Sequence, residues 1–282
     1  MGSDNGDRGG AGGIPAGGGL AGPAGAGSML LAWRQSAGER LGRPVTQADA
    51  AGAIGRSVRF YWELENGTAA RPLSRHECEV LADTLLLDRD ERHALLLHNA
   101  GGFFGLPAAP ATQGVPEALR VLIDGQSSPS FLCDRYWNVL AYNPVMADWW
   151  PWVTKPGPNL LTWLLLDPEA REQYFDWDEH ADRSIRLLRF ALVGQPDNAV
   201  LARLVNHVCA DPDVLHIWET TTEVAENRDG HIHRMRLPTL GGKTIEVVSH
   251  TLYPASLPGS RLIILTPVRD AEPDTPGSGR EA

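Results

Sequence analysis

The sequence has few of the features that mark secreted, membrane-bound or disulfide-stabilised proteins. Its three cysteines, Cys78, Cys133 and Cys209, are far apart, odd in number and never in a CxxC pair, so they predict reduced thiols. No run of 18 apolar residues occurs, and no transmembrane helix is expected. No basic segment followed by an apolar one marks a secretory signal. These absences favour a cytoplasmic protein without a membrane partner.

Catalytic and cofactor motifs are absent as well. The chain contains no GxSxG nucleophile elbow, no phosphate-binding loop and no GxGxxG, and no nucleophile is clustered with a base. We therefore predict no catalytic residues, no enzyme and no required cofactor. His231 and His233 would point the same way on a strand and could bind a metal with His207, Cys209 or His216. No carboxylate spacing completes a recognised site, so surface histidines are favoured and no metal site is predicted.

Charge is unevenly distributed along the chain. The formal net charge of −10 argues against a protein that coats nucleic acid with its whole surface. Residues 29–75, however, contain seven Arg and four acidic residues, a net +3, whereas residues 76–104 contain two Arg and six acidic residues, a net −4. One face of the first part of the chain can therefore be basic while the molecule stays acidic.

Composition divides the chain into two folded units. Residues 1–28 are mostly Gly, Ala and Pro, which is typical of a disordered tail. Gly and Pro recur in "GGFFGLPAAPATQGVP" (101–116), where they interrupt both helix and strand. The predicted organisation is a tail over 1–28, a first unit over 29–104, a linker over 105–114, a second unit over 115–268 and a flexible tail over 269–282.

The first unit is predicted to be all helical, with five helices. Leu30, Trp33, Ala37 and Leu41 follow the spacing of one helix face, and residues 88–98 form the last helix. The start and stop signals between them are N-caps at Thr46, Ser57 and Ser74, a capping-box partner at Glu77 and a left-handed stop at Asn66-Gly67.

The second unit mixes strands and helices. "SPSFLCDRYWNVLAYNP" predicts two short strands, and Asn143-Pro144 and Asp167-Pro168 each predict a helix start. Residues 180–194 and 198–209 have helical patterns. Three later segments alternate like strands, with a hairpin turn at Gly241-Gly242: "HIHRMRLP", "KTIEVVSHTLY" and "RLIILTPV". This order predicts an α+β sheet domain.

The predicted helix over 57–66 has an unusual outward face. Tyr61 and Leu64 share one side at about 100° per residue, and Arg59 and Glu63 share the opposite side. The aromatic residues that flank this outward side are Phe60 and Trp62. A structural helix seldom exposes two aromatics, and this short helix follows another across a Gly turn, as in a helix-turn-helix whose second helix enters a major groove. The alternative is an i,i+4 ion pair on a solvated face.

The segment "TQADAAGAIGRSVRFYWELENG" resembles the XRE-type, phage-repressor-like helix-turn-helix. The matching positions are Thr46-Gln47, Ala51, Ile54, Gly55, Ser57, Tyr61, Leu64, Glu65 and Gly67. Arg56 departs from the pattern, because the residue after the turn glycine is usually apolar and packed inward; Arg56 is expected to reach a phosphate instead.

The resemblance implies double-stranded operator DNA as the partner. It places Val58, Arg59 and Glu63 at base edges and Gln47, Asn66 and Arg71 at phosphates. Arg59 can donate two hydrogen bonds to guanine, Glu63 can accept from cytosine, and Val58 can contact a thymine methyl. The full predicted contact set is Arg34, Gln47, Arg56, Ser57, Val58, Arg59, Trp62, Glu63, Asn66 and Arg71. One such helix covers a half-site, so a homodimer on a (pseudo)palindromic operator is expected.

The second unit resembles the MmyB-like ligand-binding domain, which has a PAS-like fold. The segments that carry this likeness are "DRYWNVLAYNPVMADWW", "NLLTWLLLDPEAREQY", "LARLVNHVC" and "IWETTTEV". The resemblance implies that the domain can hold a fatty-acid-like or other apolar small molecule. We predict a pocket lined by Trp137, Tyr142, Trp163 and Phe190, with Arg135 as the polar anchor. The alternative is that these rings fill the core and that Arg135 belongs to a turn.

Together these features predict a sequence-specific transcription regulator associated with the nucleoid, which senses a small apolar ligand through residues 115–268. Two other interpretations remain open: a regulator whose PAS-like domain only dimerises, and an enzyme that acts on a lipid-like metabolite.

Overall fold

The computed structural model describes residues 26–99, 114–196 and 198–270. Most of the predicted tails and linker therefore lie outside the described residues. Two boundaries differ from the prediction, because residues 26–28 belong to the first helix and residues 269–270 belong to the last strand. The backbone of residues 269–270 pairs with Ile245 and Glu246, which extends the strand beyond residue 268.

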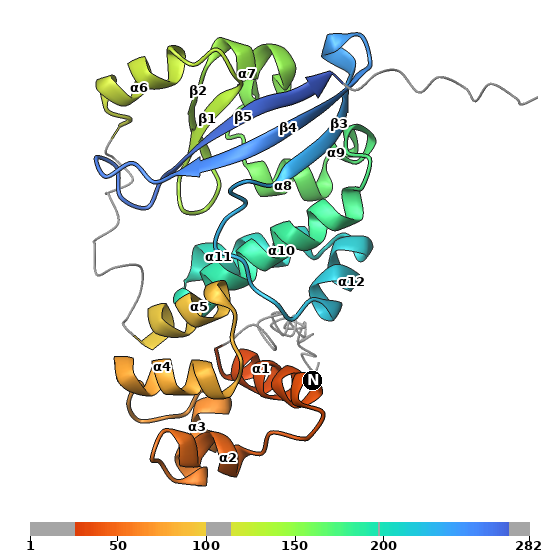
Figure 1. Cartoon of the computed structure of the whole chain (residues 1–282). Helices are drawn as coiled ribbons and strands as arrows, with labels where there is room; N and C mark the ends of the chain where they lie inside the picture. The colour runs from red at the N-terminus through yellow and green to blue at the C-terminus, as the bar shows by residue number, and fades with distance from the viewer. Residues whose placement is uncertain (1–25, 100–113, 197, 271–282) are drawn as a thin grey trace, which may run out of the picture.

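Five helices form the N-terminal unit (Figure 1). They are α1 (Ala26–Leu41), α2 (Gln47–Ala53), α3 (Val58–Glu65), α4 (Arg75–Thr84) and α5 (Arg89–Asn99). The predicted caps are confirmed: Thr46 and Ser74 form capping boxes, and the Ser57 hydroxyl accepts from the amide of Phe60. Leu41 departs from the predicted buried face because it is exposed beside Gly42, whose φ of +64° turns the chain.

One buried carboxylate ties three of these helices together. Glu65, at the end of α3, has a side chain only 4% exposed. It accepts hydrogen bonds from both Nε of Arg34 on α1 (2.6 Å) and Nε2 of Gln47 on α2 (2.6 Å). Hydrogen bonds to a charged partner are shorter and stronger than neutral ones, so this contact fixes how α3 lies against α1 and α2.

The C-terminal unit is a five-stranded antiparallel sheet with helices on one main face (Figure 1). Its strands follow the order β2-β1-β5-β4-β3. The strands are β1 (Ser130–Cys133), β2 (Val139–Tyr142), β3 (Ile232–Leu237), β4 (Lys243–Leu252) and β5 (Arg261–Asp270). The helices are α6 (Glu117–Asp124), α7 (Pro144–Trp149), α8 (Leu160–Leu166), α9 (Pro168–Gln173), α10 (Trp177–Gly194), α11 (Ala199–Val208) and α12 (Pro212–Thr220), with short 3₁₀ turns at Pro151–Thr154 and Pro238–Leu240. The predicted helix starts at Asn143 and Asp167 are confirmed, whereas α6, α8 and α12 were not anticipated.

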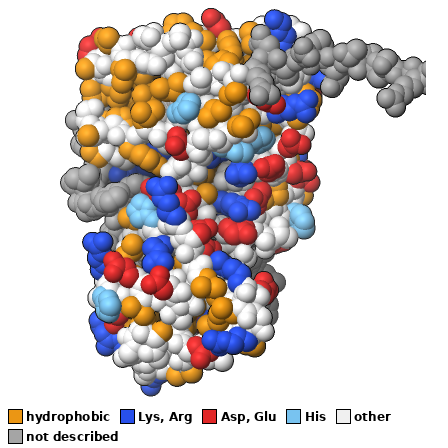
Figure 2. Space-filling model, in the orientation of Figure 1, with side chains coloured by type: hydrophobic (Ala, Val, Ile, Leu, Met, Phe, Trp, Pro, Cys, Tyr) orange, Lys and Arg blue, Asp and Glu red, His pale blue; other side chains and the backbone are white. Residues whose placement is uncertain are grey.

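The two faces of the sheet differ in what covers them. Alternate residues such as Met235, Val247 and Ile263 point toward the helices and join the larger core. On the opposite face, Leu119 and Ile123 of α6 cover only the β1–β2–β5 part. Exposed apolar side chains remain on the rest of the sheet, and Figure 2 shows hydrophobic side chains gathered over this end of the molecule.

Helix α10 joins the two units, because it packs on the sheet's helical layer and on α5 (Figure 1). The side chains of Phe190 and Val193 pack in the core of the N-terminal unit, in the same buried cluster as Leu95 and Leu97. Polar contacts complete the junction, with Nδ1 of His98 2.9 Å from the carbonyl of Val193. The units therefore meet through direct packing as well as through the chain that connects them.

The Glu65 contact leads to a stability prediction. Glu65→Gln should lower the free energy of unfolding by about 2–3 kcal/mol, because charge-assisted hydrogen bonds at a buried carboxylate are lost. Glu63→Gln is the matched control, two residues earlier on the same helix and paired with Arg59 on the surface; it should change stability by only a few tenths of a kcal/mol. Urea unfolding of both variants checks this, and equal effects would contradict the clamp role of Glu65.

Candidate functional site

The outward face of α3 is free of the rest of the described chain. The Arg59 side chain is 87% exposed, and Val58 and Trp62 are about half exposed. Nε of Arg59 lies 3.0 Å from Oε1 of Glu63, which is the i,i+4 ion pair of the alternative interpretation. Gly55, with φ +65°, makes the turn between α2 and α3, so the first turn of α3 projects from the end of the molecule. This face presents a cation, an acceptor and an apolar edge side by side.

Other predicted contact residues have intramolecular partners. Arg34 is turned inward to Glu65 and to the carbonyl of Val45, so its guanidinium stabilises the fold and does not lie on the α3 surface. Gln47 is held by the same carboxylate. Asn66 ends α3 and donates to the carbonyl of Trp62 (2.7 Å), while Ser57 caps its start.

Arg56 and Arg71 share a second carboxylate beside α3. Nη2 of Arg56 lies 2.5 Å and Nη2 of Arg71 3.3 Å from Oε1 of Glu77, and both guanidiniums lie over the Phe60 ring. The amide of Ser74, and then Arg56, keeps the pKa of Glu77 below its ordinary value. Half-exposed cations are thereby fixed next to α3, which explains how Arg is tolerated after the turn glycine. Figure 2 shows basic side chains, all of them Arg in this unit, spread over this helical end with acidic ones between them.

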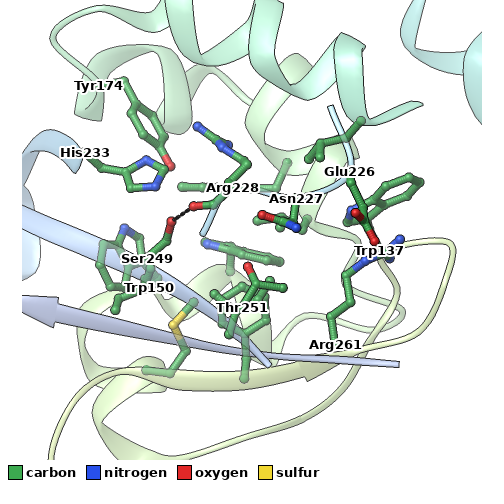
Figure 3. A pocket seen from close by; sticks show the side chains of 18 residues that line it. Trp137, Trp150, Tyr174, Glu226, Asn227, Arg228, His233, Ser249, Thr251 and Arg261 are labelled. Carbon is green, nitrogen blue, oxygen red and sulfur yellow. Dashed lines mark hydrogen bonds between the residues drawn. The ribbon is translucent and has the colours of Figure 1, made fainter. Parts of the chain in front are cut away.

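An aromatic-lined cavity of about 60 Å³ lies between the sheet and its helices (Figure 3). Trp152 and Trp163 stack in its wall with ring centroids 4.7 Å apart. Its polar lining includes Arg228, His233, Ser249 and Arg261, and the Ser249 hydroxyl donates to the carbonyl of Arg228 (2.5 Å). Further aromatic rings of the wall are Phe131, Trp137, Trp150 and Tyr174.

A larger cavity, about 320 Å³, lies beside the first. Residues from α10, α11 and the β4–β5 connection line it, and it shares Glu226 and Arg261 with the aromatic cavity. The buried Arg261 lies over the Trp137 ring at 4.8 Å and donates to the carbonyl of Asp134 (3.3 Å). Ligand pockets typically measure about 300–1,000 Å³, so the larger cavity has room for a small molecule, whereas the aromatic cavity as described has room for about two waters.

The predicted ligand residues are only partly brought together. Trp137 and Trp163 line the aromatic cavity, and Arg135 lines the larger one. Tyr142 lies exposed on the edge strand β2 and lines neither cavity. Phe190 is on the side of α10 that packs against α5, in edge contact with the His93 ring. These two predictions are corrected, because strand position and helix phase, rather than aromatic character, decide which rings face a cavity.

Most of the polar cavity residues were not among the predicted ligand residues. Alternation along β4 and β5 places Ser249 and Thr251 on the inner face with Arg261, and this period-2 pattern is the signal that could have identified them. Asn143 is fully buried and accepts hydrogen bonds from the amides of Met146 at the start of α7 and of Ser130, so it lies in neither cavity lining.

Three histidines meet at one end of the aromatic cavity. His180 of α10 joins His231 and His233, with one ring nitrogen from each within 4.8 Å of the others. The partners considered from the sequence, His207, Cys209 and His216, do not take part in this cluster. The sequence could not show that α10 supplies the third imidazole.

This architecture defines a sheet domain with internal cavities fused to a helical unit with an exposed helix face. A family model described as MmyB-like transcription regulator ligand binding domain matches residues 115–276, more than half of the chain. The chain therefore belongs to this family of transcription regulators. No curated protein matches it. Among the described helices, none combines the length and apolar character needed to cross a membrane.

Proposed function

We propose that the chain is a sequence-specific DNA-binding transcription regulator, with α2 and α3 as an XRE-type helix-turn-helix within residues 29–104. The observation that carries this proposal is the exposed face of α3, where Val58, Arg59 and Trp62 extend away from the protein. A second helix that follows a tight turn and has a free first turn is the element that helix-turn-helix proteins insert in the major groove.

The proposed base contacts follow from side-chain chemistry. The Arg59 guanidinium donates to O6 and N7 of guanine, and Glu63 accepts from N4 of cytosine. Because these two side chains pair with each other at 3.0 Å, they form a prearranged unit for a G·C step. Arg56 and Arg71, fixed by Glu77, face the flanking phosphates. Arg34 contributes only by positioning α3.

We infer that the protein works as a homodimer on a (pseudo)palindromic operator. One α3 helix covers a half-site, and two-fold symmetry supplies the second at about 34–36 Å or a multiple of it. The open face of the sheet, with Ile232, Leu252 and Val268 about half exposed, is the proposed contact for the second copy.

Residues 115–268 are proposed as a PAS-like sensor of a small apolar acid. The two adjoining cavities supply an aromatic wall for an apolar chain and guanidiniums for a carboxylate. Arg135 is the proposed anchor, because it lines the larger cavity and is less enclosed than Arg261.

Glu226 is the proposed link between ligand and DNA. It lines both cavities, its carboxylate lies 2.8 Å from Nδ1 of His93 on α5, and its amide donates to Asp90 at the start of α5. A ligand that moves Glu226 would shift α5 and the helices packed on it, favouring one relative placement of the two α3 helices. The Glu226–His93 contact is therefore the proposed route of coupling.

The DNA-binding proposal predicts the effect of Arg59→Ala. After selection of bound sequences from a random DNA pool, the variant should bind the selected site about 10- to 100-fold more weakly and keep a weak, salt-dependent affinity for any DNA. Arg75→Ala is the matched control, since Arg75 is equally exposed in an i,i+4 pair, with Glu79 of α4. Equal effects of the two substitutions would contradict a base-reading role for Arg59.

The sensor proposal predicts that the positive charge at residue 135 strengthens the binding of an apolar acid but not that of an uncharged alcohol. Arg135→Gln should weaken binding of decanoate about tenfold or more, because the carboxylate loses a charged donor, while decanol binding stays nearly the same. Calorimetric titration of both probes measures this, with the surface variant Arg183→Gln as control. If neither probe binds the wild-type protein, the ligand-independent dimerisation role is favoured.

The coupling proposal predicts that His93→Ala abolishes the effect of ligand on operator affinity without abolishing ligand binding. His93 touches Glu226 from outside both cavities, so the ligand contacts stay intact. Operator titrations with and without decanoate give the ratio of the two operator affinities, here called the coupling ratio. In His93→Ala this ratio should fall toward one. The exposed His76→Ala variant should keep the wild-type ratio, and an unchanged ratio in His93→Ala would exclude this route.

A further inference from the structure

The three-histidine cluster joins two elements that are far apart in the sequence. His180 comes from the first turn of α10, His231 directly precedes β3, and His233 lies on the inner face of β3. Nδ1 of His180 lies 3.3 Å from Nε2 of His231, and the His180 and His233 rings are stacked with centroids 5.0 Å apart. Three imidazoles therefore converge on one small volume.

His233 has unmet hydrogen-bonding capacity in the described structure. Its side chain is buried, the residue being 5% exposed, and neither ring nitrogen has a hydrogen-bond partner among the described residues. Leaving a buried polar group unsatisfied costs about 1–3 kcal/mol, and such groups in folded proteins are rare enough to call for a ligand or another specific reason. The unpartnered nitrogens adjoin the other two rings of the cluster.

We propose that His180, His231 and His233 form a binding site for a divalent transition metal, with Zn²⁺ as the best match. Zn²⁺ bonds to imidazole nitrogen at about 2.0–2.1 Å in tetrahedral geometry, which places neighbouring ligand nitrogens about 3.3–3.4 Å apart. The separation of 3.3 Å between His180 and His231 meets this requirement. Three histidines leave a fourth position for water or another small ligand, and the half-buried His231 provides access from solvent.

Arg228 competes with the metal for one ligand atom. Its Nη2 lies 2.9 Å from Nδ1 of His180, so the guanidinium uses the lone pair that Zn²⁺ would take. Arg228, whose Nε is buried, also borders the aromatic cavity, where Figure 3 shows it between His233 and Glu226. Metal binding must displace this side chain, and an acid in the cavity that attracts Arg228 would free His180. Zn²⁺ and an anionic cavity ligand should therefore each increase affinity for the other.

The first test measures metal binding to the full chain after removal of bound metal with a chelator, at pH 7.5. Calorimetry should show one Zn²⁺ per chain, and Co²⁺ should give the visible absorption of a tetrahedral site. His231→Gln should weaken binding by about 100-fold or more, since even the outer partners of metal ligands contribute about 10- to 100-fold. His207→Gln, an exposed histidine of α11 outside the cluster, is the control and should bind like wild type.

A second variant separates this proposal from a purely structural cluster. Arg228→Gln removes the competing cation and should tighten Zn²⁺ binding about tenfold or more, whereas Arg183→Gln, a neighbouring surface cation, should have a smaller effect. Absence of Zn²⁺ binding in both wild type and Arg228→Gln overturns the proposal, as does equal affinity of His231→Gln and His207→Gln. If phosphate binds more tightly than Zn²⁺, and if this phosphate binding is lost in Arg228→Gln, the cluster is an anion site and not a metal site. None of these measurements depends on DNA binding.

Discussion

The Glu65 carboxylate, shared by Arg34 and Gln47, is the contact on which the proposed DNA-facing surface depends. It holds α3 against α1 and α2 and so leaves the opposite side of α3, with Arg59, turned outward. Glu77 plays a similar part on the next helix, because it fixes Arg56 and Arg71 beside the same surface. Two carboxylates thus convert four otherwise flexible cationic or amide side chains into a fixed arrangement around one short helix.

Helix α10 brings the rest of the molecule into contact with that arrangement. Leu187 and Leu188 face the C-terminal core, and Phe190 and Val193 face the N-terminal one. Such a helix cannot shift toward one core without changing its packing on the other, because protein interiors are close-packed. Together with the Glu226–His93 contact, this packing gives the proposed coupling a direct path from the cavities to α5.

The cavities combine apolar walls with buried cations. Arg261 is buried, the Nε of Arg228 is buried as well, and desolvation lowers the pKa of Arg228 to about 10. Burying unpaired charge is costly, so these guanidiniums favour occupants that bring negative charge, and the three histidines next to Arg228 favour a metal ion when that guanidinium moves away. An apolar acid and a divalent metal are therefore chemically compatible occupants of adjoining spaces.

Local signals in the sequence determined the helix starts at Thr46, Ser57, Ser74, Asn143 and Asp167, because a cap depends on residues only three or so positions apart. They also determined that Arg59 and Trp62 lie on the exposed face of α3, since eight residues of helix fix which side chains share a side, and the alternation that marks the later strands. Phe60, expected beside Trp62, packs partly against the helical core. The cavities could not be predicted in this way. Tyr142 and Phe190 are aromatic, as pocket residues often are, but Tyr142 lies on an edge strand and Phe190 on the side of α10 that faces away from the cavities. His180 contacts His231, which is 51 residues further along the chain. Only tertiary packing decides such meetings, because the angle and register between elements are set by long-range contacts that no local pattern encodes.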